Sequence, residues 1–262
     1  MRHNKLREML KAGQPTVGTH VRNVTPTFVE VIGHTGLFDY VEFSAEYAPF
    51  DLYDLENFCR AAELYDMSTM IKVDQEPRRF LAQRAIGAGF QSVLFADCHT
   101  VDDVRECVRA VRPDVPGAGG THGAAFRRSA LVSSAGTPEY VRSLEQVVIV
   151  LMVEKKPIVD EIEQVLLVAG VDMLQWGPAD YCMSIGRPGE TDHPSVKAAE
   201  RRVIEAGLKM GIPSRAEIDS ADAAKYYLDL GVRHFCIGTD VTILYQWLKQ
   251  NGEALRRAIE GS

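Results

Sequence analysis

Residues 171–180 read VDMLQWGPAD. The first half is a short, mostly apolar run of the kind that forms a buried strand, and it leads directly into Gly177, Pro178 and an acid. This pattern predicts a strand that ends where a helix begins. Asp180 then either caps the helix that follows or serves as a ligand for something bound at the end of the strand.

The strand-then-helix pattern of this stretch recurs along the whole chain. Short runs rich in Val, Ile, Leu and Phe alternate with helical patterns, and such repeats imply parallel strands joined by right-handed crossovers. Eight units in about 250 residues predict an α/β fold, a single (β/α)8 TIM barrel, and no Gly-x-Gly-x-x-Gly follows the first strand to favour a Rossmann sheet. The predicted strands are residues 16–21, 40–44, 69–73, 92–96, 147–153, 172–177, 209–213 and 234–238.

The composition is that of an ordinary soluble globular protein. Its length suits one barrel domain spanning residues 1–262. The net charge of −7 and the absence of long like-charge blocks argue against nucleic-acid binding, and no apolar run approaches the roughly 18 residues of a membrane span. Five scattered cysteines form no Cys-x-x-Cys pair, which predicts reduced thiols and a cytoplasmic protein.

Two segments lie outside the simple repeat. Residues 113–146 form a long excursion, which is usually functional in a compact domain, although a flexible surface loop is the alternative. Its GGTHG sequence at 119–123, followed by Arg127, suits either an anion site or a structural turn, and its His122 is an isolated histidine. We expect this excursion and a C-terminal helix at 242–260 to lie in contacts between subunits.

Two acidic side chains follow neighbouring predicted strands. In a barrel, functional groups gather where the strands end at the C-terminal face, so Glu154 and Asp180 converge there. Two carboxylates repel unless a cation or a proton lies between them, and hard oxygen ligands favour Mg²⁺ or Mn²⁺. The alternative is that Asp180 caps the next helix while Glu154 pairs with Lys155 or Lys156.

Other polar groups lie at the same face. Lys72 in the third strand is placed to stabilise a developing oxyanion, to form a Schiff base if its pKa is depressed, or simply to pair with a carboxylate such as Glu46. The backbone of Gly177, Pro178 and Ala179 offers N–H groups at a helix start to a substrate carboxylate. His99 follows the fourth strand, and lone histidines are more often structural than catalytic.

A set of ordered motifs covers nearly the whole chain. It includes LKAGQPTVGTHV at 10–21, GLFDYVEFSAEYAP at 36–49, VLMVEKK at 150–156 and, most specific, GVDMLQWGPADYCMSIG at 170–186. These motifs resemble the HpcH/HpaI aldolase/citrate lyase family, and within it the class II metal-dependent pyruvate aldolases. The resemblance implies a (β/α)8 barrel in a homo-oligomer, commonly a hexamer of swapped dimers, that is, a trimer of dimers.

The resemblance also implies roles for particular residues. Glu154 and Asp180 match the family's metal ligands, and the metal would be Mg²⁺ or Mn²⁺, with Co²⁺ as a further option. In such enzymes the ion chelates the carboxylate and keto oxygen of pyruvate and stabilises the enolate. The backbone of 177–179 matches the segment that holds the pyruvate carboxylate. Lys72 stands where the family has an oxyanion-stabilising arginine, which keeps the charge but loses bidentate geometry.

Departures from the family pattern concentrate in its acid–base machinery. The family's Asp-Gly-Glu-His-Ala-Pro is here 44–49, SAEYAP, so Tyr47 replaces the catalytic histidine. The aspartate partner of that histidine falls on Gly87. Glu46, which the family places near the metal-bound water, is retained. The resemblance therefore implies that the residues for metal binding and enolate stabilisation are preserved, while those for proton transfer are replaced.

Three functions follow from this pattern. The first is a metal-dependent lyase that cleaves a 4-hydroxy-2-oxo acid into pyruvate, or a related 2-oxo acid, and an aldehyde. The second uses the same platform for decarboxylation, isomerisation or hydration, because Tyr47 and Gly87 replace the family's His and Asp. The third is a non-catalytic oxoacid-binding protein. In each case the partner is a small 2-oxo acid, with neither nucleic acid nor membrane.

Overall fold

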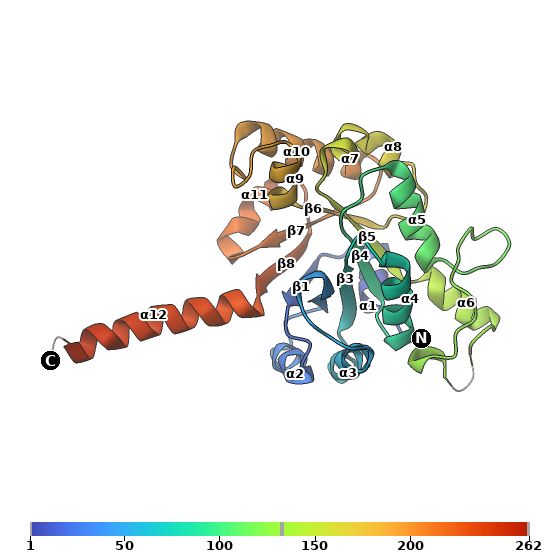
Figure 1. Cartoon of the computed structure of the whole chain (residues 1–262), viewed down its shortest axis with the longest axis horizontal. Coiled ribbons are helices and arrows are strands. Elements are labelled where there is room, and N and C mark those ends of the chain that lie inside the picture. The colour runs from blue at the N-terminus through green and yellow to red at the C-terminus, as the bar shows by residue number, and fades with distance from the viewer. Residues whose placement is uncertain (1, 132–133, 261–262) are drawn as a thin grey trace.

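A computed structural model describes residues 2–131 and 134–260 (Figure 1). Its eight strands are all parallel and close into a barrel in the order in which they occur along the chain, so the predicted (β/α)8 barrel is confirmed. The strands are β1 (Thr16–Val21), β2 (Tyr40–Ser44), β3 (Ser68–Val73), β4 (Ser92–Phe95), β5 (Val148–Val153), β6 (Met173–Trp176), β7 (Ser214–Ile218) and β8 (His234–Thr239).

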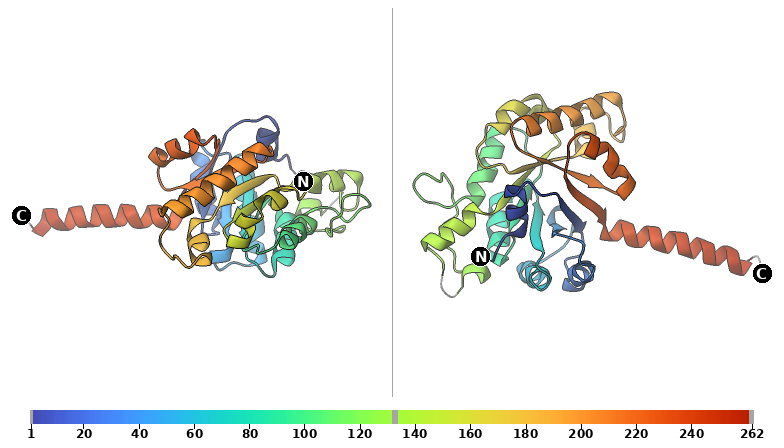
Figure 2. Two further views of the ribbon diagram at one scale, coloured as in Figure 1. Left: turned by 90° about the horizontal axis from the view of Figure 1, so that it is seen from above. Right: turned by 180° about the vertical axis from the view of Figure 1, so that it is seen from behind.

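The helices lie between the strands and cover the outside of the barrel (Figures 1 and 2). The described α-helices are α1 (Lys5–Lys11), α2 (Pro26–His34), α3 (Leu52–Glu63), α4 (Arg78–Ala88), α5 (Val101–Val111), α6 (Pro138–Glu145), α7 (Lys156–Asp160), α8 (Ile162–Leu166), α9 (Pro178–Ser184), α10 (Pro194–Lys209), α11 (Ala224–Asp229) and α12 (Asp240–Glu260). Short 3-10 turns are η1 (Ala45–Tyr47), η2 (Arg128–Ala130) and η3 (Ala221–Ala223).

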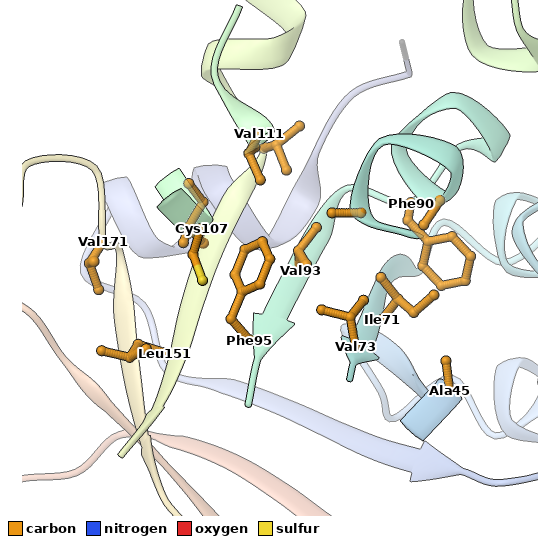
Figure 3. Packing of buried hydrophobic residues seen from close by; sticks show 14 of the residues in the cluster. Ala45, Ile71, Val73, Phe90, Val93, Phe95, Cys107, Val111, Leu151 and Val171 are labelled. Carbon is orange, nitrogen blue, oxygen red and sulfur yellow. The ribbon is translucent and has the colours of Figure 1, made fainter. Parts of the chain in front are cut away.

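Strands β2 to β6 are buried on both faces, as their mostly apolar runs predict. Side chains on the outer face pack under the helices, and Figure 3 shows Val93 and Phe95 of β4 turned toward Cys107 and Val111 of α5. A separate inner cluster fills the amino-terminal part of the barrel and includes Leu6 of α1. This packing leaves the carboxyl ends of the strands for polar residues.

Strand β7 is the one predicted strand that was wrong. Residues 209–213 are not a strand, because α10 continues to Lys209 and the chain then turns at Gly211, whose φ is +74°. The strand itself is SRAEI at 214–218, with Arg215 buried inside the barrel. The other seven strands begin and end within one residue of the prediction. A search for apolar runs misses a strand whose inward side chains are charged.

The excursion at 113–146 is built partly from regular structure, with η2 and α6 inside it. His122 forms an isolated parallel bridge with Pro113, and its backbone N–H donates to the carbonyl of Arg112 at 3.1 Å. A side chain at Gly120 would lie 1.9 Å from the same carbonyl oxygen, so glycine is required there. These backbone contacts favour a structural role for GGTHG, one of the two predicted alternatives, although the segment is an irregular stretch with one bridge and the turn itself lies at residues 116–118.

Helix α12 projects from the barrel as a straight arm (Figures 1 and 2). It contains the predicted helix at 242–260 and begins two residues earlier. None of its described residues is buried, although several are large and apolar. Within the described ranges, no helix has both the length and the apolar character needed to cross a membrane.

Candidate active site

A cavity of about 330 Å³ opens at the carboxyl ends of the strands. Most of the sequence-predicted site residues line it together: Tyr47, Lys72, Glu154, Gly177, Pro178, Ala179 and Asp180. Glu46 does not line the cavity, but its carboxylate contacts the Lys72 ammonium. The parallel barrel thus gathers side chains from β2, β3, β5 and β6 at one face, as strand order alone predicts.

Glu154 directly follows β5 and is only 3% exposed. Its Oε1 accepts a hydrogen bond from the backbone N–H of Asp97 at 2.7 Å. Burial raises the pKa of Glu154 to about 7, and the neighbouring Asp180 and Asp97 carboxylates add to the rise, while that N–H and the Lys72 ammonium oppose it. A cation in direct contact would therefore strongly stabilise the charged form of this buried carboxylate.

Asp180 lies in the first turn of α9, but the residue at the N-cap position is Gly177 and no side chain caps this helix. Asp180 instead accepts a hydrogen bond from Lys155 Nζ at 2.9 Å, and the same amine lies 2.6 Å from the Asp97 carboxylate. The predicted alternative of a capping Asp180 is therefore wrong. The alternative pairing of Glu154 with Lys155 is wrong too, because Lys155 bridges two other acids.

The two carboxylates fit a divalent ion. No group of three or more His, Cys, Asp or Glu side chains is assembled for a metal among the described residues. Mg²⁺ and Mn²⁺ do not require one, because Mg²⁺ commonly binds through one or two carboxylates and completes its shell with water and substrate. A Cβ on Gly177 would lie 2.6 Å from Glu154 Oε2, so only glycine keeps that oxygen accessible.

Lys72 forms a compact group with Glu46 and Tyr47. Its Nζ lies 2.5 Å from Glu46 Oε2 and donates to the Tyr47 hydroxyl at 2.5 Å. Burial alone would lower the pKa of Lys72, but its interactions with Tyr47 and Glu46 outweigh burial and raise the pKa above its usual value. Lys72 is thus a protonated cation, which favours a role at an oxyanion over a Schiff base.

Tyr47 is half-exposed, and its ring contacts the Lys72 ammonium, whose Nζ lies 4.4 Å from the ring centroid. Burial raises the pKa of Tyr47, and the opposing effect of Lys72 does not overcome it. The negative charge of the nearby Glu46 carboxylate raises the pKa of Tyr47 further. The phenol is therefore neutral at physiological pH rather than a phenolate.

The start of α9 offers fewer N–H groups than the sequence suggested. The Gly177 N–H donates to the Val153 carbonyl at 3.1 Å, and Pro178 has no N–H. The backbone N–H groups left for an anion are those of Ala179 and Asp180, in the first turn of the helix. If a substrate carboxylate binds at this helix start, it would therefore contact the N–H groups of Ala179 and Asp180 rather than that of Gly177.

The structure adds a polar network that sequence reasoning missed. Arg215 of β7 is fully buried and its Nη2 lies 2.5 Å from Glu42 Oε2 of β2. Arg215 Nε donates to Gln175 Oε1 at 2.6 Å, and Gln175 Nε2 donates to Glu217 at 2.8 Å. His20 of β1 lies 3.7 Å from Glu217. The alternating charges of SRAEI were the signal that could have revealed this strand and its partners.

Three further residues that the sequence singled out, Gly87, His99 and His122, lie outside this cavity. Gly87 is in α4, and a Cβ there would lie 2.3 Å from Cδ of Arg127, so that side chain fills the place of an acid at position 87. The His99 backbone N–H bonds to Asp103 in the cap of α5. His122 is buried beside the Tyr140 ring, and neither ring nitrogen has a hydrogen-bond partner in the described structure.

An all-parallel barrel with two acids and a lysine at the carboxyl ends of its strands places its candidate active site where barrel enzymes have theirs. The HpcH/HpaI aldolase/citrate lyase family model matches residues 17–245, and this chain belongs to that family. Enzymes of this family are aldolases and lyases that typically depend on a divalent metal ion.

Individual relatives agree with this membership. A hydroxypyruvate/pyruvate aldolase of Delftia acidovorans is 27% identical over 244 residues, covering 93% of this chain and 89% of its own. A 4-hydroxy-2-oxo-heptane-1,7-dioate aldolase of Escherichia coli is 27% identical over 243 residues, covering 92% and 90%. The crystal structure of an HpcH/HpaI family protein from Burkholderia cenocepacia J2315 aligns with a TM-score of 0.87 and 29% identity, covering 97% and 100%.

Proposed function

We propose that the protein is a metal-dependent carbon–carbon lyase that cleaves a 4-hydroxy-2-oxo acid into pyruvate, or a related 2-oxo acid, and an aldehyde. The observation that carries the proposal is the convergence of Glu154 and Asp180 in one cavity with the Lys72 ammonium. The names of the aldolases of D. acidovorans and E. coli support the same reaction class.

Each of these residues has a distinct role in the proposed reaction. Glu154 and Asp180 would hold the divalent ion, Mg²⁺, Mn²⁺ or Co²⁺. When bound, such an ion supplies Lewis-acid polarisation of the substrate's keto group. The Ala179 N–H orients the substrate carboxylate at the start of α9. Lys72 faces the negative charge that develops when the carbon–carbon bond breaks, and its ammonium favours that charged state.

Proton transfer falls to Tyr47 and Glu46. The Tyr47 hydroxyl accepts a hydrogen bond from Lys72, and the same ammonium lies 2.5 Å from the Glu46 carboxylate. We infer a relay in which the substrate hydroxyl gives its proton to the Tyr47 oxygen as the Tyr47 proton passes to the Glu46 carboxylate. In this arrangement Glu46 is the base and the neutral phenol is the carrier, so no phenolate is required.

One observation favours a second reaction on the same platform. Tyr47 is neutral and position 87 offers no carboxylate, because Arg127 occupies that space. An enzyme that forms the same 2-oxo-acid enolate by decarboxylation, isomerisation or hydration needs a different proton path from an aldolase. A 2-oxo-acid-binding protein without catalysis is the third candidate, and the pair of carboxylates, Glu154 and Asp180, on one cavity weighs against it.

The protein's assembly is a further part of this proposal. Helix α12 exposes Tyr245, Trp247 and Leu248 to solvent in a single chain, and so large an apolar surface is normally covered in an assembly. We infer a homo-oligomer, a hexamer or trimer of dimers, in which a second copy covers α12 and the excursion at 113–146 contributes contacts. The five buried free cysteines suit the reducing cytoplasm.

The direct test measures pyruvate release from 4-hydroxy-2-oxo acids by the metal-stripped protein, before and after adding Mg²⁺, Mn²⁺ or Co²⁺. We expect activity only with metal, and its loss in Glu154→Ala. Glu163→Ala on α8 is the matched control, since the Glu163 carboxylate is exposed and its one ion pair among the described residues is with Arg202. Unchanged metal binding and activity in Glu154→Ala would refute the site.

Deuterium exchange separates the alternative functions. Exchange of pyruvate methyl protons into D₂O without aldol cleavage would favour a reassigned enolate reaction. Binding of 2-oxo acids with neither exchange nor cleavage would favour a binding protein. The assembly is tested by light scattering of the full chain, in which a monomer at micromolar concentration would contradict the proposed oligomer.

A further inference from the structure

Asp97 lies at the carboxyl end of the barrel, two residues beyond the end of β4. Strand β5, which pairs with β4, leads to Glu154, and β6, which pairs with β5, leads to Asp180. Asp97 does not line the cavity at the strand ends, and the proposed function gives it no role. Its backbone contacts Glu154 and its side chain is linked to Asp180, so this arrangement needs its own explanation.

The backbone of Asp97 has an unusual conformation. Its φ is +53°, and among the described residues the only other non-glycine residue with a positive φ is Asp66. Residues with a Cβ rarely adopt this left-handed region, although aspartate tolerates it better than most. Such residues cluster at functional sites, where the surrounding contacts hold the backbone in place. The contacts of Asp97 therefore identify what this conformation serves.

The backbone N–H of Asp97 holds the first proposed metal ligand. It donates to Glu154 Oε1 at 2.7 Å, and Glu154 is almost fully buried. The other oxygen, Oε2, lies beside Gly177 at the start of α9, where a Cβ would come within 2.6 Å of it. One oxygen of Glu154 is thus occupied by the N–H, and the other lies beside the helix that carries Asp180.

The side chain of Asp97 holds the second proposed ligand through Lys155. The Lys155 Nζ lies 2.6 Å from Asp97 Oδ1 and donates to Asp180 Oδ1 at 2.9 Å. The Lys155 side chain is only 13% exposed, whereas that of Asp180 is 38% exposed. A buried ammonium fixed between two carboxylates restricts the orientation of the more exposed one. Asp97 is therefore linked to both ligands, to Glu154 through its N–H and to Asp180 through Lys155.

The charges of this group are balanced by Asp97. Lys155 carries a positive charge next to Asp180, and alone it would repel a divalent ion at that carboxylate. The Asp97 carboxylate neutralises Lys155, which leaves the charges of Glu154 and Asp180 for the ion. The two remaining negative charges match the charge of Mg²⁺ or Mn²⁺.

We propose that Asp97 is a positioning residue for both metal ligands: its N–H orients Glu154, and its carboxylate orients Asp180 by holding Lys155 in place. No group of three or more His, Cys, Asp or Glu side chains is assembled for a metal in the part of the chain that the structure describes, so Asp97 acts through its partners rather than as a third ligand. The inference rests on the metal site of the proposed function. It adds a residue that sets the affinity of that site.

The test is calorimetric titration of the metal-stripped, full-length protein with Mn²⁺. Asp97→Asn keeps the backbone N–H and the side-chain size but removes the charge that holds Lys155, so Mn²⁺ affinity should fall about 10–100-fold. Asp97→Gly keeps the N–H and suits a φ of +53°, so it should show the same loss even if the asparagine variant folds poorly. Asp102→Asn is the matched control, since the Asp102 side chain is 84% exposed and pairs with Arg105. It should bind Mn²⁺ like the unaltered chain.

A double variant separates orientation from charge. Asp97→Asn combined with Lys155→Met removes one charge of each sign, so the net charge around the two ligands is that of the unaltered chain. If Asp97 positions the ligands, the double variant should recover only part of the lost Mn²⁺ affinity. Full recovery would show that Asp97 acts only by charge balance and would overturn the inference.

The remaining outcomes separate this inference from the proposed function. If Glu154→Ala loses Mn²⁺ binding but both Asp97 variants bind the ion like Asp102→Asn, the inference is overturned and the metal site stands. If the unaltered chain does not bind Mn²⁺, the proposed function and this inference fail together. Thermal unfolding of the metal-stripped variants completes the test, because a purely structural role would lower the Tm without changing the Mn²⁺ affinity of the folded protein. That result would also overturn the inference.

Discussion

Replacing Arg215 by methionine should destabilise the protein strongly, because it leaves Glu42 buried without its cation. Arg215 and Glu42 are both essentially inaccessible, and their charged groups lie 2.5 Å apart inside the barrel. Removing one partner of a buried pair costs about 3–5 kcal/mol. At an unfolding entropy of about 2.1 cal/mol/K per residue, a loss of about 4 kcal/mol in this 262-residue chain lowers the Tm by about 7 °C.

The loss of folding stability in Arg215→Met should also depend on pH, and it should grow as the pH rises. In the intact protein burial acts to raise the pKa of Glu42, but the Arg215 charge, with help from His20, holds that pKa below its usual 4.5. Without Arg215, burial raises the pKa of Glu42 above its unfolded value. The variant then keeps its stability at a pH below about 4.5, where Glu42 is protonated in both states, and loses it progressively as the pH rises.

A double-mutant cycle measured by thermal and urea unfolding isolates the pair. Glu42→Leu combined with Arg215→Met removes both charges, and we expect it to recover most of the lost stability. Arg202→Met is the control, since its pair with Glu163 is 45% and 67% exposed and is worth about 0–1 kcal/mol. If Arg215→Met costs no more than Arg202→Met, or if the double variant is as unstable as the sum of the single variants, this view of the pair is refuted.

Three further predictions concern the site and the excursion. Gly177→Ala should abolish activity while the protein stays folded by circular dichroism, because the new Cβ would lie 2.6 Å from Glu154 Oε2; retained activity would contradict this. Tyr47→Phe should lower kcat by about 10²–10⁴-fold with metal affinity unchanged in titration, and an unchanged kcat would remove Tyr47 from proton transfer. Burial, with the Arg127 charge, lowers the pKa of His122 to about 4, so its contribution is complete above its unfolded pKa of 6.5 and is lost as the pH falls toward 4. Urea unfolding should show a loss of up to about 3 kcal/mol over that range, which His122→Phe should remove; an unchanged pH dependence in the variant would contradict it.

Much of the fold could be predicted from the sequence because its signals are local. Short apolar runs that alternate with helical patterns define βα units, and the rules of parallel strands convert eight such units into a barrel. The strand ends then place Glu154 and Asp180 at the same face without any knowledge of packing. The strand at 214–218 escaped this reasoning, since Arg215 is stabilised by an acid on a strand far away along the chain.

The sequence by itself determined which residue types stand at the carboxyl ends of the strands, since strand order and direction follow from the repeat. Only the tertiary structure decided how those groups are paired: Lys155 bridges Asp97 and Asp180, Lys72 joins Glu46 and Tyr47, and Arg215 neutralises Glu42. The physical reason is that ion pairs and pKa values depend on burial and on distances of a few ångströms between segments far apart in the chain. The strand register and the barrel closure set those distances, and neither can be read from a local stretch of sequence.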